Sequence, residues 1–276
     1  EGLAGEPISV YSAYNDLDEA RFAVNKIKDW QEKGGALNDA AMLYRNNAQS
    51  RVLEEALIQV GLPYRIYGGM RFFERQEIKD ALSYLRLMAN RNDDAAFERI
   101  VNTPTRGLGD KTLETLRFAA RDRGCTMWDA SVALLEEKVL AGRAATALGR
   151  FVELINALED DTCEMSLHIQ ADHVIKYSGL YAMYEQEKGE KSKARIENLE
   201  ELVTATRQFE KPEEAEDMSL LTAFLTHAAL EAGEGQADEF EDAVQLMTLH
   251  SAKGLEFPLV FMVGSGRRDV SKSNVS

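Results

Sequence analysis

The stretch AVQLMTLHSAKGLEFPLVFMV, residues 243–263, decides how this chain is expected to fold. Its ends, Ala243–Leu249 and Pro258–Val263, are short apolar runs that are typical of buried strands, and a polar loop lies between them. The long segment that precedes it, from Phe73 onward, carries apolar residues at helical spacing and no convincing alternating strand. Strand patterns that follow such a helical block indicate that an α/β layer resumes there.

The first seventy or so residues carry the beginning of the same layer. Three segments are expected to be strands: Ile8–Ala13, Ala40–Tyr44 and Tyr64–Tyr67. Helical patterns separate them, one capped by Asp16 or Asp18 and ending near Gly34, the other running from about Ala48 to Val60. An α/β layer that stops and resumes is most simply one domain with another inserted into it.

The inserted block is expected to be entirely helical. A first helix is predicted over Glu74–Met88, and further helices are expected around Ala95, Thr112, Trp128, Ala141, Leu167, Ile196 and Leu220. The whole chain should therefore be mixed α and β but mostly helical. No stretch approaches the roughly 18 apolar residues that cross a bilayer, so no membrane partner is expected. The isolated cysteines, Cys125 and Cys163, indicate neither a disulfide framework nor a zinc site, and we expect a soluble, cytoplasmic protein.

The charge distribution leaves a nucleic-acid partner open. The net charge of -15 argues against one at first, because phosphate binding requires clustered cations. However, residues 210–242 hold eleven acidic residues against one basic residue, so -10 of the total lies in that segment. Residues 71–111 hold eight basic residues against seven acidic ones, interspersed with aromatic residues. Ordinary solvated helix faces are the alternative interpretation of both segments.

The polar loop Thr248–Pro258 is the most specific string in the chain. Ligands of α/β sheets usually meet the loops that leave the carboxyl ends of strands. This loop offers a hydroxyl, an imidazole, a cation and a carboxylate within nine residues, and Gly254 would allow a left-handed turn. A capped turn without a ligand is the alternative.

Two further segments have the chemistry of phosphate sites. In LYRNNAQSR, residues 43–51, Arg45 would follow a strand and Asn47 would begin a helix, so a cation and backbone donors converge. A structural role for Arg45 is the alternative, and Arg51 can pair with Glu54 or Glu55 instead. In TPTRGLGDKT, residues 103–112, two glycines expose backbone N–H groups where a helix begins, as in a clasp on duplex phosphate. A plain turn between helices is the alternative there.

Together these segments resemble elements of the UvrD-type superfamily 1 DNA helicases. The loop resembles motif V, residues 43–51 resemble motif IVa, and residues 103–112 resemble the glycine-isoleucine-glycine element of the mobile 2B domain, with Leu108 replacing isoleucine. The resemblance implies a RecA-like α/β domain of the P-loop-NTPase type, called 2A, incomplete and divided between residues 1–68 and 241–264. A helical 2B domain would occupy residues 69–240. Residues 265–276 match nothing in the family, and we interpret them as a disordered tail or an artificial addition.

The resemblance also implies roles for individual residues. Single-stranded DNA would contact Arg45, Asn47, Thr248 and His250. Duplex DNA would contact Arg106, Gly107, Gly109, Lys111 and Thr112. Glu256 would point toward the nucleotide ribose, with Gly254 beside it, and Lys253 could serve either the nucleotide or the DNA.

The function implied is part of an ATP-dependent 3′-5′ DNA helicase that acts in DNA repair and replication. The chain contains no G-x-x-x-x-G-K-[ST] motif, so no catalytic residue is expected in it. ATP and Mg²⁺ would be cofactors of the intact enzyme, with neither expected on this chain alone. Single-stranded and forked duplex DNA would be the partners, with DNA repair proteins as further candidates, at the bacterial nucleoid. The alternatives are a stand-alone acidic helical interaction module and a purely structural insertion.

Overall fold

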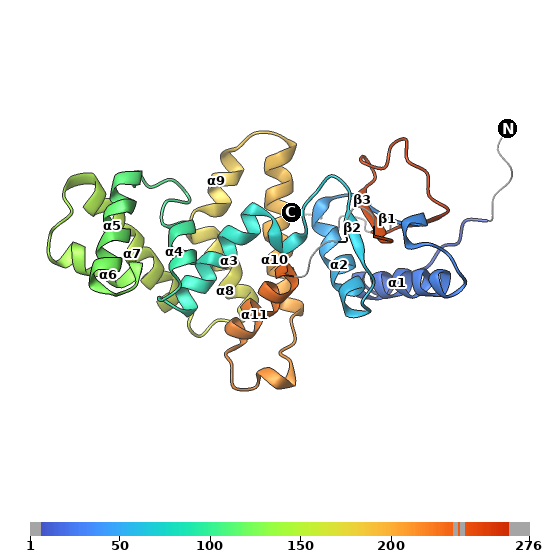
Figure 1. The fold of residues 1–276 in the computed structure, drawn as a ribbon, viewed down its shortest axis with the longest axis horizontal. Coiled ribbons are helices and arrows are strands. Elements are labelled where there is room, and N and C mark those ends of the chain that lie inside the picture. The colour runs from blue at the N-terminus through green and yellow to red at the C-terminus, as the bar shows by residue number, and fades with distance from the viewer. Residues whose placement is uncertain (1–6, 234–236, 238–240, 265–276) are drawn as a thin grey trace, which may run out of the picture. The chain divides into compact units, whose positions relative to one another are not determined.

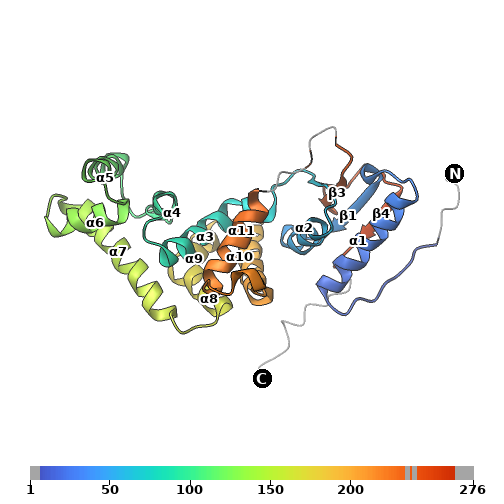
Figure 2. The same cartoon turned by 60° about the horizontal axis from the view of Figure 1, so that its bottom comes forward.

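The computed structural model describes residues 7–233, 237 and 241–264, and the chain divides into two compact units (Figures 1 and 2). Glu1–Phe72 and Gly235–Ser276 form the first, here called the sheet unit. Phe73–Glu234 form the second, here called the helical unit. This division falls at Phe72 and Gly235, and the domain boundaries at residues 68 and 241 stay a prediction from the sequence.

Both ends of the chain contribute to a four-stranded parallel sheet in the sheet unit. Its strands are β1 (Ala40–Tyr44), β2 (Tyr64–Ile66), β3 (Val244–Thr248) and β4 (Leu259–Met262), in the order β2-β3-β1-β4. Tyr44 lies beside Thr248 across the β1–β3 pair, and Leu43 lies beside Met262 across the β1–β4 pair. The two late strands therefore complete a layer that begins near the N-terminus, as the sequence predicts.

One face of this sheet packs against two helices, α1 (Asp16–Glu32) and α2 (Ser50–Gln59). Short 3-10 turns, η1 (Leu37–Asp39) and η2 (Asn47–Gln49), flank β1. Alternate strand residues such as Met42 and Leu246 meet Ile27 of α1 and Leu57 of α2 in a single apolar core. Helix α1 buries Ala20, Ala23, Val24 and Ile27, the spacing of one helical face. These contacts fix the strand ends that carry the candidate DNA elements.

The predicted strand Ile8–Ala13 is wrong. Those residues form no strand, and Ile8 and Val10 are 95% and 92% exposed. Their alternating apolar pattern is compatible with a strand, but a strand also requires a neighbour to take its backbone hydrogen bonds. Instead, the Tyr11 ring stacks on Phe22 of α1, with ring centroids 3.8 Å apart. The cap of α1 also differs from the prediction, because the side chain of Asn15 accepts the hydrogen bond.

The described part of the helical unit contains helices and 3-10 turns but no strand. Its helices are α3 (Gln76–Ala89), α4 (Asp94–Ile100), α5 (Asp110–Arg123), α6 (Met127–Glu136), α7 (Gly142–Thr162), α8 (Leu167–Tyr177), α9 (Leu180–Gln186), α10 (Glu190–Gln208) and α11 (Leu220–Gly233). The 3-10 turn η3 (Phe72–Glu74) leads into α3, and η4 (Glu213–Ala215) precedes α11. A mixed, mostly helical fold is therefore confirmed, although the sequence reading missed the short helix α9.

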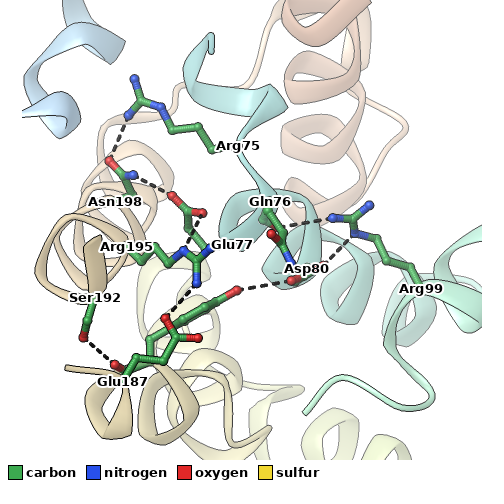
Figure 3. Close-up of polar contacts among 10 residues, drawn as sticks. Arg75, Gln76, Glu77, Asp80, Arg99, Glu187, Ser192, Arg195 and Asn198 are labelled. Atoms are coloured by element: carbon green, nitrogen blue, oxygen red, sulfur yellow. Dashed lines mark hydrogen bonds and ion pairs between the residues drawn. The ribbon is translucent and has the colours of Figure 1, made fainter. Parts of the chain in front are cut away.

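A buried polar network joins the start of α3 to α10 (Figure 3). The guanidinium of Arg75 donates from Nη1 to Oδ1 of Asn198, at 2.8 Å. Asn198 in turn donates from Nδ2 to Oε1 of Glu77, at 2.6 Å. Arg195 contacts the carboxylate of Glu77 at 4.0 Å and that of Glu187 at 2.8 Å. Because both groups of the Asn198 amide are used, this one residue bridges a buried cation and a buried anion.

The same network extends from α3 to α4 and α9. Arg99 donates from Nε to Oδ1 of Asp80 at 2.7 Å (Figure 3). The Tyr184 hydroxyl donates to Oδ2 of Asp80 at 3.4 Å. Burial raises the pKa of the Asp80 carboxyl, and the neighbouring Arg99 offsets only part of that effect. Burial likewise raises the pKa of the Tyr184 phenol. The helices of this unit are thus joined by polar as well as apolar contacts.

Candidate nucleic-acid interface

Two of the predicted DNA elements leave the same edge of the parallel sheet. Tyr44 ends β1 and Thr248 ends β3, and these two residues are partners in the register. The backbone N–H of Leu249 donates to the carbonyl of Tyr44, at 2.8 Å, which joins the two chain exits directly. Residues 45–47 and the loop from Leu249 onward are therefore neighbours, although some two hundred residues separate them in the sequence.

The turn after β1 is held in shape by a capping box. The Gln49 side chain accepts hydrogen bonds from the backbone N–H of Arg45 at 2.9 Å and of Asn46 at 3.2 Å. Asn46 returns the contact by accepting from the N–H of Gln49, at 3.3 Å. Arg45 and Asn47 are exposed on this turn. Arg45 is therefore a cation at the carboxyl edge of the sheet, and the side chains of Asn46 and Gln49 hold the backbone of its turn in place.

Arg51 has a structural role, which was the alternative left open by the sequence. Its Nη1 lies 2.9 Å from Oε2 of Glu55, one helical turn along α2, and the residue is buried. The i,i+4 spacing of opposite charges on a helix was the signal that allowed this interpretation.

The loop between β3 and β4 folds as a succession of tight turns. The hydroxyl of Thr248 lies 2.9 Å from that of Ser251 and accepts from the Ser251 N–H at 3.2 Å. The N–H of Ala252 donates to the Thr248 carbonyl, at 3.0 Å. Gly254 has a φ of +87°, a left-handed conformation that L side chains rarely adopt. Thr248 thus organises the loop from its base.

The other polar residues of this loop are exposed. His250, Lys253 and Glu256 all lie on the surface of the sheet unit. An imidazole, an ammonium and a carboxylate are therefore presented together beyond the carboxyl edge. His250 and Lys253 can donate to phosphate oxygens, and the Glu256 carboxylate can accept from sugar hydroxyls. Among residues 7–233, 237 and 241–264, no group of three His, Cys, Asp or Glu side chains is arranged to hold a metal.

The predicted duplex element lies in the helical unit, at the start of α5. Gly107 has a φ of +80°, and Gly109 is the N-cap residue, with no side chain capping the helix. Leu108 between them is only 2% exposed, whereas both glycines and Lys111 are exposed. A Cβ added at either glycine would meet no atom within 4 Å. The turn therefore presents bare backbone to open space beside a helix N-terminus.

Arg106 lies differently from the other predicted duplex contacts, because its guanidinium is used inside the protein. It donates to the carbonyls of Ile100, at 2.8 Å, and Pro104, at 3.2 Å, and to the hydroxyl of Tyr84. It also lies over the ring of Phe151, 5.2 Å from the centroid. A planar group with several donors suits such converging acceptors. The sequence predicts Arg106 as a direct duplex contact, and that role stays a prediction, but its guanidinium bonds to groups of the protein itself.

The sequence reading missed the residue that closes this turn, Asn102. Its Nδ2 donates to the carbonyl of Leu108 at 2.9 Å, and its Oδ1 accepts from the N–H of Arg106 at 2.7 Å. An asparagine four residues ahead of an arginine and six ahead of a turn residue carries little signal by itself. The tendency of asparagine side chains to bond nearby backbone is the only hint available.

Comparisons with known proteins place the chain in a family. Residues 2–269 match the model of the UvrD-like helicase C-terminal domain. The chain is 72% identical to DNA helicase II of Escherichia coli over 264 residues, 96% of this chain and 37% of that protein. It is 66% identical to DNA helicase II of Haemophilus influenzae, over 96% of this chain and 36% of the relative.

A more distant relative is the ATP-dependent DNA helicase PcrA of Staphylococcus aureus. The chain is 40% identical to it over 260 residues, which is 94% of this chain and 35% of that helicase. The chain thus spans a little over a third of the length of the relatives that it matches. No helix in its described part is both long and apolar enough to cross a membrane. Because the family model covers nearly the whole chain, the protein belongs to the UvrD-like helicase C-terminal domain family.

Proposed function

We propose that this chain is the DNA-gripping part of an ATP-dependent 3′-5′ DNA helicase. The sheet unit would be most of domain 2A and the helical unit would be domain 2B. The observation that carries the proposal is the adjacency of two single-strand elements, the Arg45 turn and the His250 loop, at the carboxyl edge of one parallel sheet. Ligands of such sheets bind at that edge.

The single strand would bind across this edge. Arg45 would pair with a backbone phosphate, and Asn47, Thr248 and His250 would complete the contact surface. The turn at Arg45 is fixed by Gln49, and the loop at His250 is fixed by Thr248 and Ser251. A rigid surface of this kind binds with a smaller entropic cost than a mobile one.

The residues of this chain suit the ribose of ATP but not its phosphates. Glu256 would accept hydrogen bonds from ribose hydroxyls, with Lys253 and Gly254 beside it in the same loop. The sequence offers no P-loop lysine for the phosphates, and the described residues offer no acidic cluster for Mg²⁺. When bound to the whole protein, ATP would supply the free energy for stepping. This chain would couple the nucleotide to DNA through the His250 loop.

The duplex ahead of the single strand would be held by the helical unit. The backbone N–H groups around Gly107 and Gly109 and at the start of α5 would receive a phosphate, assisted by the helix dipole. Lys111 would add a cation and Thr112 a hydroxyl. We further propose single-stranded and forked duplex DNA as substrates, DNA repair and replication as the setting, and the bacterial nucleoid as the location, with repair proteins as additional partners.

Fluorescence anisotropy with labelled DNA tests this function on the 276-residue chain. We expect salt-sensitive binding to a forked duplex, weakened by combining Lys111→Ala with Thr112→Ala, while binding to a plain single strand is retained. The control is Lys188→Ala, which removes an exposed cation from the segment between α9 and α10. Forked-duplex binding that the double substitution leaves unchanged would remove the case for a duplex clasp.

A further inference from the structure

We propose that Arg106 and Asn102 are positioning residues, which hold the Gly107–Gly109 turn in the shape that receives a phosphate. The inference rests on the proposed function of that turn as a duplex clasp. It assigns to Arg106 a role beneath the turn, acting through the turn's backbone, in place of direct contact with DNA. Three sets of contacts carry the inference.

The first set fixes the chain that leads into the turn. Nη1 of Arg106 donates to three backbone carbonyls, those of Ile100 at 2.8 Å, Pro104 at 3.2 Å and Val101 at 3.3 Å. These carbonyls lie at the end of α4 and just beyond it. One guanidinium nitrogen therefore gathers the residues that connect α4 to the turn.

The second set ties Arg106 to the core of the helical unit. Its Nη2 donates to the Tyr84 hydroxyl on α3 and, at 3.5 Å, to the carbonyl of Ser178, which follows α8. The Tyr84 hydroxyl in turn donates to the carbonyl of Thr103, at 2.7 Å. Tyr84 is fully buried, and burial raises its pKa, so the phenol remains protonated as a donor. The turn is thus attached to helices that lie far from it in the sequence.

The third set closes the turn from within. The Asn102 amide donates to the Leu108 carbonyl at 2.9 Å and accepts from the N–H groups of Arg106, at 2.7 Å, and Leu108, at 3.4 Å. The Leu108 side chain is buried, which anchors the middle of the turn. Gly107 and Gly109 are left exposed on either side.

The consequence is a clasp that is formed before DNA arrives. Backbone N–H groups that already point in fixed directions lose less conformational freedom on binding a phosphate. Because amide groups carry no net charge, their contribution to binding releases no counterions. A direct arginine–phosphate contact releases them and steepens the salt dependence of binding, by about 0.9 in the logarithmic slope per neutralised phosphate.

That difference gives the test, which measures forked-duplex affinity of the 276-residue chain by anisotropy over a series of salt concentrations. Arg106→Gln is expected to weaken binding roughly threefold to tenfold, as loss of a preorganised contact does, while the salt slope stays at the wild-type value. Lys111→Ala is expected to lower the slope by about 0.9. A slope lowered to the same extent by Arg106→Gln, or wild-type affinity in that variant, overturns the positioning role.

A second variant keeps the inference testable should Arg106→Gln not fold. Asn102→Ala removes the turn's internal hydrogen bonds without altering any charge, so weaker duplex binding at unchanged slope is expected again. The matched control is Arg91→Gln. Arg91 also caps backbone carbonyls, those of Leu87 and Met88, and lies over an aromatic ring, that of Trp128, but it does not contact the turn.

The outcomes separate the inference from the function on which it rests. Duplex affinity should be unchanged in Arg91→Gln. If Arg91→Gln weakened duplex binding as much as Arg106→Gln does, the effect of Arg106 would be general destabilisation, and the inference would be overturned. If Lys111→Ala with Thr112→Ala leaves duplex binding intact, the duplex clasp itself fails. If that double variant weakens binding but Asn102→Ala and Arg106→Gln do not, only the positioning role fails.

Discussion

At the scale of single residues, the two glycines of the turn before α5 are required for different reasons. Gly107 has a φ of +80°, which other residues adopt only with strain. Gly109 has an ordinary extended backbone, with φ at −80° and ψ at 165°, and a Cβ added there would meet no atom within 4 Å. The fold therefore explains Gly107, whereas the proposed DNA contact gives a reason for the bare backbone at Gly109.

Gly109→Ser separates folding from binding. Serine is at least as good an N-cap as glycine, so the free energy of unfolding should change by only a few tenths of a kcal/mol, in the stabilising direction. Forked-duplex affinity should nevertheless fall, because a side chain would stand where the phosphate approaches. Urea unfolding and anisotropy on the same preparation measure both quantities.

The companion substitution Gly107→Ala should instead lower the stability of the fold. It forces a left-handed residue and should cost about 1–2 kcal/mol of unfolding free energy. A Gly109→Ser variant that binds forked DNA as tightly as the wild type would show that no phosphate reaches this position.

How far single residues could be predicted depends on where their partners lie. The pairing of Arg51 with Glu55 is local and was visible as a helical spacing. The partners of Arg106 include Tyr84, Phe151 and Ser178, which come from three distant parts of the chain. No local pattern reports such a convergence, so the sequence indicated only a candidate duplex contact at this arginine.

At the scale of elements, the amide of Asn198 links α10 to the start of α3 by hydrogen bonds to Arg75 and Glu77. We expect Asn198→Leu, which keeps the branched shape of the side chain but removes its polar atoms, to lower the free energy of unfolding by about 2–4 kcal/mol, because Arg75 and Glu77 would each lose a buried partner. Urea denaturation followed by circular dichroism measures the change. Asn156→Leu is the control, since Asn156 is exposed on α7 and should change stability by less than about 0.5 kcal/mol.

The turn after β1 gives a second prediction at this scale. Gln49→Ala removes the acceptor of the Arg45 and Asn46 N–H groups and should loosen the turn that presents Arg45. Affinity for a single strand should fall about threefold, as expected for an imperfectly ordered contact, whereas the duplex contact in the other unit should be unaffected. Gln59→Ala, at the exposed end of α2, the helix that follows this turn, should leave both affinities unchanged. Equal affinities in all three proteins would contradict the role of the capping box.

Elements with strong periodicity and clear ends were predictable, and the remainder were not. The strand Ala40–Tyr44 was located to the residue, because an apolar run between turn signals has few other interpretations. The segment Ile8–Ala13 failed because alternation cannot reveal whether a neighbouring strand is present. Helix α9 was missed because its seven residues follow Gly179 without a capping side chain, whereas the equally short α4 begins after the capping residue Asp93.

At the scale of the whole molecule, the chain carries the proposed DNA-contact elements but no P-loop motif in its sequence. The proposed single-strand elements, at Arg45 and His250, lie in the sheet unit, and the proposed duplex element, at Gly107 and Gly109, lies in the helical unit. The charge of -15 is compatible with this arrangement, because Arg45, His250, Lys253 and Lys111 lie outside the acidic segment 210–242. DNA binding should accordingly be weak and strongly dependent on salt.

The absence of a P-loop from the sequence leads to a prediction about activity. We expect the chain to release no phosphate from ATP above background, with or without single-stranded DNA, because its sequence contains no P-loop lysine to hold the phosphates. A phosphate-release assay measures this directly. DNA-stimulated hydrolysis that persists after repurification would refute the claim that this chain cannot hydrolyse ATP alone.

One measurement tests the central claim, that this chain grips a single strand with one unit and a duplex with the other. It is the affinity for a plain single strand and for a forked duplex, measured on four proteins. These are the wild type, Arg45→Ala, Lys111→Ala with Thr112→Ala, and the variant that combines all three substitutions. Arg45→Ala should weaken single-strand binding, the Lys111 and Thr112 pair should weaken only forked-duplex binding, and the triple substitution should weaken both. Wild-type affinity of the triple variant for the forked duplex would contradict the account.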